Sequence, residues 1–257
     1  MIKSFFSSCH LFLSLRQRAL PWYLMVLAIS CSGGIVANAT APAFPLHTSG
    51  QFIVDSNGAR VRLNAFDWYG AEGLDYVVEG LQAQPLPSIV NTIKGMGFNA
   101  VRLLWSNQMV ESNPVVGSYA LTANPSLEGE NALTIFDQVI QALTNAGIMV
   151  ILDNHVSTAG WCCSTIDGNE LWYNSSYPES SWIADWQTMA QRYDSNPWVI
   201  GADLRNEPRS PGHLGREFEY GLARRGRAWR QCRSRRKPQL TNLCRGRELR
   251  GRSLGRG

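Results

Sequence analysis

Hydrophobic positions along the chain alternate between short continuous runs and longer segments with helical spacing. The continuous runs have the length of strands and lie at 61–66, 100–104, 148–152 and 198–204. Between them, apolar residues recur three or four positions apart, in the sets Leu86, Ile89, Val90, Ile93 and Met96; Leu133, Phe136, Ile140 and Leu143; and Ile183, Trp186, Met189, Ala190 and Tyr193. Apolar strands that alternate with amphipathic helices are typical of a parallel sheet buried on both faces. The pattern predicts an α/β fold with four parallel strands.

Turn-forming residues mark the ends of several elements. Gly97 and Gly147 follow the first two predicted helices, where a helix commonly ends. Upstream, Asn57-Gly58 separates two short apolar runs within 51–63, which is the strongest short-range signal of a β-hairpin. A small hairpin is therefore expected to open the folded domain, after an Ala/Pro-rich linker at 40–46.

The N-terminal segment has the pattern of an export signal. Basic residues at Lys3, Arg16 and Arg18 precede an apolar run at 19–29, and the small-residue site Ala37-Asn38-Ala39 follows. We expect residues 1–39 to be a signal peptide, which predicts a secreted, extracellular protein without membrane association after cleavage. An uncleaved anchor that also uses the apolar stretch 5–15 is the alternative.

Charge is distributed very unevenly along the 257 residues. Residues 1–210 contain 10 Lys and Arg against 17 Asp and Glu, whereas residues 211–257 contain 14 against 3. The net charge of +4 therefore describes neither part, and any nucleic-acid binding would depend on the last segment alone. We predict no nucleic-acid partner.

The basic segment 211–257 differs from the rest of the chain in composition as well. It has 13 Arg and 8 Gly but no Val, Ile, Met or Asp, so nothing in it has the apolar periodicity needed to cover a sheet. We interpret it as a low-complexity tail, frame-shifted or disordered. An arginine-rich arm that binds an anionic polymer is the functional alternative.

The motif Asp203-Leu204-Arg205-Asn206-Glu207-Pro208 directly follows the last predicted strand. Active sites of parallel α/β folds lie at the carboxyl ends of the strands, which is where this motif falls. Glu207 is therefore the best candidate for a proton donor, since partial desolvation there raises the pKa of a carboxyl group. Asn206 can hold a substrate hydroxyl by hydrogen bonding. The alternative is a simple turn in which Pro208 ends the strand.

Two other strands carry polar candidates. Arg102 lies inside an apolar run, where an unpaired charge is unfavourable, and His155 follows the strand at 148–152. A structural salt bridge and a hydrogen-bonded loop histidine are the alternatives for these two residues. Aromatic residues that could stack on sugar rings are expected in loops after strands, namely Trp68, Tyr69, Trp105, Trp161, Trp172 and Tyr173.

The cysteines predict neither a dense disulfide framework nor a metal site. Cys162 and Cys163 are the cysteines of the acidic body, and adjacent cysteines are poorly placed to bond to each other. Each is expected to pair with a distant partner instead. The spacing also lacks the second cysteine or histidine pair of a zinc site, so we predict no metal.

The motifs named above carry a family resemblance. They are Leu63-Asn64-Ala65-Phe66-Asp67-Trp68-Tyr69-Gly70, Gly97-Phe98-Asn99-Ala100-Val101-Arg102-Leu103, Ile151-Leu152-Asp153-Asn154-His155 and Val199-Ile200-Gly201-Ala202-Asp203-Leu204-Arg205-Asn206-Glu207-Pro208. Together they resemble glycoside hydrolase family 5, in its cellulase (endo-β-1,4-glucanase) branch, from about His47 to Arg209.

This resemblance implies a (β/α)8 TIM barrel that hydrolyses β-linked glucans or mannans with retention, without cofactor or metal. Glu207 matches the general acid/base of the family, and Asn206 matches the residue that holds the sugar 2-hydroxyl. Arg102 and His155 match polar residues of the catalytic subsite, and Trp68 matches an aromatic residue of the substrate cleft. A β-glucan polysaccharide or oligosaccharide is the implied partner of a monomer.

The sequence departs from the family pattern after the fourth strand. A retaining glycosidase needs two carboxylates about 5 Å apart, and no glutamate after a further strand supplies the nucleophile. We therefore expect 47–210 to be a partial barrel, truncated after about four βα units, with little or no activity, open sheet edges and an uncovered apolar face. A non-catalytic carbohydrate-binding remnant that uses Trp68, Trp105 and Trp161 is the alternative.

Overall fold

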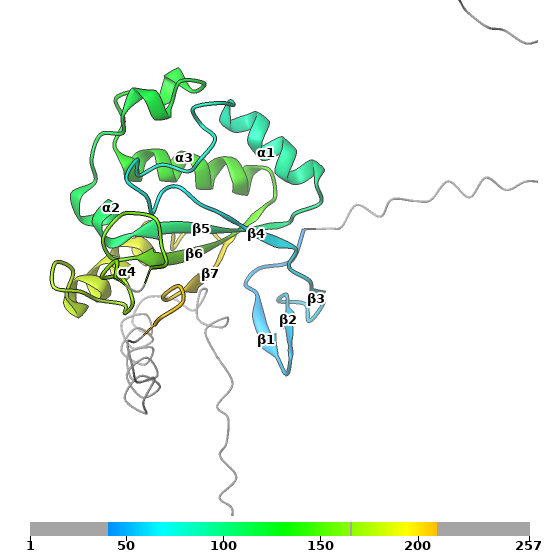
Figure 1. Ribbon diagram of the computed structural model, residues 1–257. Helices are drawn as coiled ribbons and strands as arrows, with labels where there is room; N and C mark the ends of the chain where they lie inside the picture. The colour runs from blue at the N-terminus through cyan, green and yellow to red at the C-terminus, as the bar shows by residue number, and fades with distance from the viewer. Residues whose placement is uncertain (1–40, 165, 210–257) are drawn as a thin grey trace, which may run out of the picture. The chain divides into compact units, whose positions relative to one another are not determined.

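The computed structural model describes residues 41–164 and 166–209 (Figure 1). The expected signal peptide at 1–39 and the basic tail at 211–257 lie outside the described residues. In the described part of the chain, no helix has both the length and the apolar character needed to cross a membrane.

A four-stranded parallel sheet forms the centre of the fold, as predicted. Its strands are β4 (Ala65–Trp68), β5 (Ala100–Ser106), β6 (Met149–Val156) and β7 (Val199–Asp203), paired in the order β4-β5-β6-β7. β4 begins later than the predicted run, because Arg60 and Val61 belong to a different strand that pairs elsewhere. Within the described residues, β4 and β7 are the two edges of this sheet.

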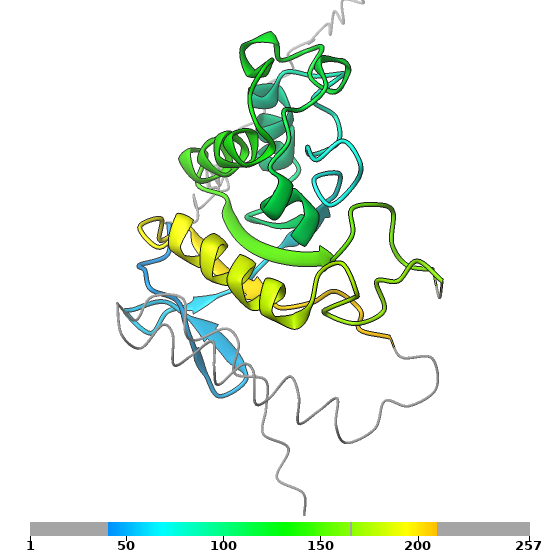
Figure 2. The ribbon, with the colours of Figure 1, turned by 90° about the vertical axis from the view of Figure 1, so that its left-hand side faces the viewer.

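Three amphipathic helices follow strands of the sheet, also as predicted. They are α1 (Leu86–Gly95), α3 (Ala132–Asn145) and α4 (Glu179–Arg192). Leu133, Phe136, Ile140 and Leu143 of α3 are all buried. They belong to one apolar core with the β5 residues that face the helices, and burying each such side chain contributes roughly 1.5–3 kcal/mol. Figure 2 shows α3 and α4 packed along the sheet.

A short helix that the pattern did not predict, α2 (Asn107–Ser112), directly follows β5. The Ser106 hydroxyl accepts a hydrogen bond from the Met109 backbone N–H at 3.1 Å, which caps its first turn. Six residues are too few to show a helical period, so only the cap could have indicated it. Two 3-10 turns, Ser118–Ala120 and Pro125–Leu127, precede α3.

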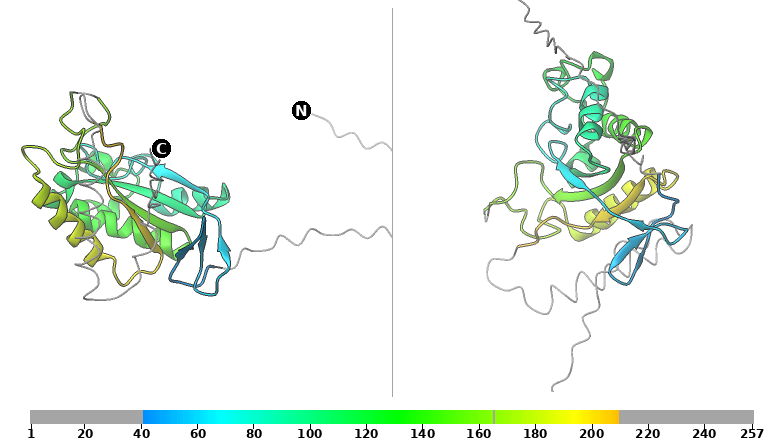
Figure 3. Two further views of the ribbon diagram at one scale, coloured as in Figure 1. Left: turned by 90° about the horizontal axis from the view of Figure 1, so that it is seen from below. Right: turned by 90° about the vertical axis from the view of Figure 1, so that its right-hand side faces the viewer.

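The predicted hairpin is confirmed as part of a three-stranded antiparallel sheet. Its strands are β1 (His47–Ser49), β2 (Phe52–Val54) and β3 (Arg60–Val61). In the turn, Gly58 has a φ of +81°, and the Asp55 carboxylate accepts hydrogen bonds from three backbone N–H groups at 2.8–3.1 Å. Figure 3 shows this sheet at one end of the four parallel strands.

The expected linker is partly packed into the fold. Leu46 is 4% exposed and belongs to a second apolar cluster with Ala100, Met149 and Ile200 at the amino ends of the parallel strands. The Phe44 ring lies edge-on to Trp198, with 4.9 Å between the ring centroids. The face of the sheet opposite the helices is therefore covered at this end, and the expectation of a bare apolar face is wrong there.

Candidate active site

Arg102 is the centre of a charged cluster on the sheet face opposite the helices. Its guanidinium forms ion pairs with Asp67 at 3.2 Å, with Asp153 at 2.9 Å and with Asp203 at 2.9 Å. Burial opposes the charge, but the ion pairs, led by Asp153 and Asp203, outweigh it and raise the pKa of Arg102. The structural salt bridge that was the alternative for Arg102 is therefore present. Arg102 also lies in the candidate site, so both interpretations of this residue hold.

Asp153 and His155 alternate along β6 and so point to the same face of the sheet. The Asp153 carboxylate is fully buried, and its Oδ2 lies 2.6 Å from His155 Nδ1. Desolvation raises the pKa of Asp153, although the hydrogen bond from His155 and the charge of Arg102 act in the opposite direction. With Nδ1–H donating to this carboxylate, Nε2 of His155 carries a lone pair that can accept a hydrogen bond.

Asn206 joins Arg102 and His155 just beyond the end of β7. Its backbone N–H donates to the Asn154 carbonyl at 3.0 Å, which holds the segment against β6. Its Oδ1 accepts from Arg102 Nη2 at 3.0 Å, and its Nδ2 lies 3.3 Å from His155 Nε2. The structure thus brings together three of the four predicted catalytic residues. His155 itself lies within β6, so its expected place in a loop is wrong.

Glu207 is the predicted residue whose environment differs most from expectation. It follows Asn206 with a φ of +36°, a conformation that non-glycine residues rarely adopt. Its side chain is 68% exposed, and its carboxylate lies 3.8 Å from Arg209 Nη1. The expected partial desolvation of Glu207 is therefore wrong in this structure, because the left-handed backbone turns the side chain toward solvent.

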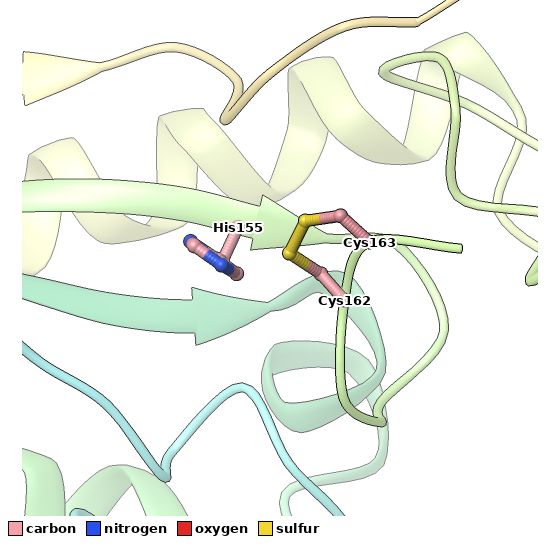
Figure 4. Close-up of side chains that lie close together, drawn as sticks. All are labelled: His155, Cys162 and Cys163. Carbon is pink, nitrogen blue, oxygen red and sulfur yellow. A yellow bond between two sulfur atoms is a disulfide. The ribbon is translucent and has the colours of Figure 1, made fainter. Parts of the chain in front are cut away.

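Cys162 and Cys163 form a disulfide with each other beside this cluster (Figure 4). The expectation that each would find a distant partner is wrong. Both sulfur atoms lie 3.7 Å from Asn206 Nδ2, so the two side chains point to the same side of the backbone.

Three of the aromatic residues expected to contact sugar are buried instead, namely Trp68, Trp105 and Trp172. Trp68 is 5% exposed, and its indole N–H donates to the Glu79 carbonyl at 2.9 Å. Trp105 lies within β5 and is fully buried against α4. Both positions have the strand parity that points toward the helices, so Trp68 and Trp105 are core residues. Tyr69 and Trp161 are exposed, with ring centroids 5.7 Å apart.

Sequence reasoning did not assign roles to Asp153 and Asp203, although both stood in the motifs examined. A usable signal was present: Asp153 and His155 are two positions apart in one strand and therefore share a face. The partnership with Arg102 was not visible, because it depends on the register between three strands.

A second buried polar network lies on the helix side of β6. Asn154 accepts from Arg205 Nη1 at 3.0 Å and donates to Asn107 Oδ1 at 3.1 Å, and Asn107 donates to Asp185 Oδ2 at 2.6 Å. Desolvation lowers the pKa of Arg205 to about 10 and raises the pKa of Asp185 to about 7. This network anchors the segment that carries Asn206 and Glu207 to β6 and α4.

Comparison with known proteins gives consistent matches. A family model described as Cellulase (glycosyl hydrolase family 5) matches residues 54–230, which extends past Arg209 into the part of the chain that the structure does not describe. An endoglucanase of Paenibacillus polymyxa is 38% identical over 181 residues, covering 70% of this chain and 44% of that protein. The major extracellular endoglucanase of Xanthomonas campestris pv. campestris is 36% identical over 182 residues, covering 70% of this chain and 36% of that protein.

Solved structures are similar over the same part of the chain. The catalytic domain of the major Xanthomonas endoglucanase superposes with a TM-score of 0.62 at 31% identity, covering 71% of this chain and 53% of that one. An endocellulase from Pyrococcus horikoshii in complex with cellotetraose has a TM-score of 0.58 at 29% identity, covering 70% and 48%. The chain spans less than half the length of the curated relatives it matches.

Proposed function

This chain belongs to glycosyl hydrolase family 5, and from that premise we propose that its site binds a β-linked glucan and serves the hydrolysis of the glycosidic bond. The observation that carries the proposal is the meeting of Arg102, from the first half of β5, with His155 and Asn206 near the carboxyl ends of β6 and β7. The relatives are named endoglucanases, and one similar structure holds cellotetraose, which supports a β-glucan oligosaccharide as the ligand.

Each residue of the site has a role in this proposal. The Asn206 amide is held in one orientation, with its oxygen toward Arg102, so its Nδ2–H groups can donate to a sugar hydroxyl. His155, fixed by Asp153, and Arg102 line the subsite beside it. Glu207, the next residue along the chain, acts as the general acid/base on the glycosidic oxygen of the bound sugar. Trp68 is left out of the sugar contacts because its ring is buried.

We further propose that residues 47–210 are part of a (β/α)8 barrel domain. We also propose that the nucleophile of this domain is not among the described residues. In those residues, Asp67, Asp153 and Asp203 face the site, and each is paired with Arg102. A carboxylate that neutralises an arginine is a poor nucleophile for an anomeric carbon, and retention requires a second free carboxylate about 5 Å from the acid. Because the described residues supply no such carboxylate, we expect the protein to bind sugar but to hydrolyse it slowly or not at all.

The same comparison also bears on where the protein acts. One relative is named an extracellular enzyme, which supports secretion of this chain as well. We propose a secreted monomer that acts on β-glucan and binds neither nucleic acid nor membranes after signal cleavage.

Cellotetraose binding to the purified full chain, measured by titration calorimetry, tests the sugar site. Asn206→Ala should weaken binding roughly tenfold or more, because it removes hydrogen bonds whose combined contribution is about 1.5 kcal/mol or more. Asn145→Ala, which removes an exposed amide on α3, is the matched control and should leave binding unchanged. Absence of binding, or an equal loss in both variants, would contradict the proposed site.

Release of reducing ends from soluble β-1,4-glucan and from β-mannan tests the catalytic part separately. We expect little or no release by the chain. Turnover that Glu207→Gln abolishes would show that the chain supplies its own nucleophile and would overturn the proposed inactivity, while supporting the assignment of Glu207. The ratio of the two rates would then give the substrate preference.

A further inference from the structure

Three potential metal ligands converge at the edge of the site just described. One ring nitrogen of His155 and the sulfur atoms of Cys162 and Cys163 all lie within 4.8 Å of one another. Figure 4 shows the imidazole and the two sulfur atoms side by side at the end of β6. His155 and Cys162 are half-buried and Cys163 is exposed, so a solute can reach the group from solvent.

His155 has the arrangement that a metal-binding histidine requires. Its Nδ1 lies 2.6 Å from Asp153, a carboxylate that is fully buried and itself held by Arg102. A carboxylate behind the imidazole fixes the ring and its tautomer and makes the other nitrogen a better ligand. That other nitrogen, Nε2, lies on the side of Asn206 and the sulfur atoms.

The disulfide makes this ligand set depend on redox state. While Cys162 and Cys163 are bonded to each other, neither sulfur is a thiolate. Two thiols, or one dithiol, supply two electrons and two protons: the S–S bond breaks, two cysteine thiols form, and the reductant becomes a disulfide. The two thiols then lose their protons as a metal ion binds.

We propose that the reduced Cys162–Cys163 pair and His155 form a binding site for a soft divalent cation. Two thiolates and one imidazole match the preference of Zn²⁺ and Cd²⁺, with a fourth position left open to water. In a tetrahedral site with metal–sulfur bonds of about 2.3 Å, ligand atoms lie about 3.5–4 Å apart. Once the S–S bond is broken the sulfur atoms must separate, while the histidine nitrogen already lies within 4.8 Å of both, so side-chain rotation can complete the site. The inference is independent of the proposed hydrolase activity, because it requires no sugar.

Cadmium titration of the full chain tests the site. Four cysteines outside the described residues are first replaced, as Cys9→Ser, Cys31→Ser, Cys232→Ser and Cys244→Ser. The protein is reduced with a phosphine, which is then removed anaerobically. We expect one Cd²⁺ per chain, seen as thiolate-to-metal charge transfer in the near ultraviolet, and no such band in the oxidised protein. A band of equal intensity in both states, or none in the reduced state, would overturn the proposal.

Single variants identify the ligands. Cys163→Ser should abolish one-to-one binding, and His155→Gln should weaken it at least about tenfold. His47→Gln, in β1, is the matched control and should bind as the parent does. Equal affinity of His155→Gln and the parent would refute the three-ligand site.

If His155→Gln does not fold, chemical modification of the unaltered protein tests the role of His155 instead. Bound Cd²⁺ should protect His155, and not His47, from acylation by diethyl pyrocarbonate, as mapped by mass spectrometry. Acylation of His155 at the same rate with and without Cd²⁺ would contradict the role of the imidazole.

Discussion

At the scale of single residues, Arg102 is the side chain on which the others in the site depend. Its replacement by Met would leave Asp153, which is fully buried, without a cation. Breaking a buried ion pair by removing one partner typically lowers the free energy of unfolding by about 3–5 kcal/mol, because the remaining charge stays desolvated. We expect Arg102→Met to show a loss of this size in urea-induced unfolding.

Arg192→Met is the control for this loss. Arg192 pairs with Asp137, but the two side chains are 34% and 38% exposed. An exposed pair contributes about 0–1 kcal/mol, so this variant should change stability little. A similar small effect of Arg102→Met would show that the cluster around Asp153 does not stabilise the fold.

Asp185 predicts a pH dependence of stability. Desolvation raises its pKa to about 7 in the folded state, whereas an unfolded chain has an Asp pKa of about 3.9. Between these pH values the folded state keeps a proton that the unfolded state has lost. The free energy of unfolding should therefore fall as the pH rises from about 4 to 7, by at most about 1.4 kcal/mol per pH unit.

Asp185→Asn removes this titration while keeping an oxygen that can accept the hydrogen bond from Asn107. Urea unfolding over this pH range should therefore give a flatter profile for the variant than for the parent. Parallel profiles would contradict the assignment of the dependence to Asp185.

The identities of the site residues could be predicted, whereas their environments could not. Arg102 and Asn206 stood out because a charge inside an apolar run and a polar motif after a strand are visible in one dimension. The exposure of Glu207 depends on its left-handed backbone, and the burial of Trp68 depends on the exact start of β4. The hydrophobic pattern of the sequence reveals neither the backbone conformation of Glu207 nor the residue at which β4 begins.

At the scale of elements, the end of α1 depends on a glycine that can adopt a positive φ angle. Gly97 has a φ of +84°, while Gly95 is the last helical residue, and a Cβ at either position would contact nothing within 4 Å. Gly97→Ala should therefore lower the free energy of unfolding by about 1 kcal/mol, since only the backbone conformation is unfavourable.

Gly95→Ala is the matched control, because alanine favours a helix. It should raise the free energy of unfolding by about 0.5–1 kcal/mol. Thermal or urea unfolding of the two variants should thus give shifts of opposite sign, and shifts of the same sign would contradict this account of the helix end.

Long periodic elements were predictable and short ones were not. The runs that became β5, β6 and β7 and the helices α1, α3 and α4 were all identified from spacing. The strands β5 and β6 extend beyond their apolar runs into polar residues, so His155, which the apolar run at 148–152 places after the strand, lies within it. Here pairing with neighbouring strands, which a single segment does not reveal, decides where the strand ends.

At the scale of the whole described chain, the small antiparallel sheet and the parallel sheet are joined through the cluster around Leu46. Leu46→Ala should lower the free energy of unfolding by about 2–5 kcal/mol, because the cavity would open beneath Ala100, Met149 and Ile200. Leu74→Ala, at a position 73% exposed, should stay within about 0.5 kcal/mol of the parent. A small effect at Leu46, in the same unfolding experiment, would indicate that the two sheets are energetically separate.

The ion pairs of Arg102 also constrain the geometry of the backbone. Neighbouring strands lie about 4.8 Å apart, so in a flat sheet β4 and β7 would be separated by about 14 Å. Yet one guanidinium on β5 reaches carboxylates on β4, β6 and β7 at 2.9–3.2 Å. These short distances draw all four strands toward one side chain, and the attraction favours a concave surface. Any substitution that alters the charge offered to a ligand at this position would therefore also change how far the sheet bends, so recognition and backbone shape cannot vary independently here.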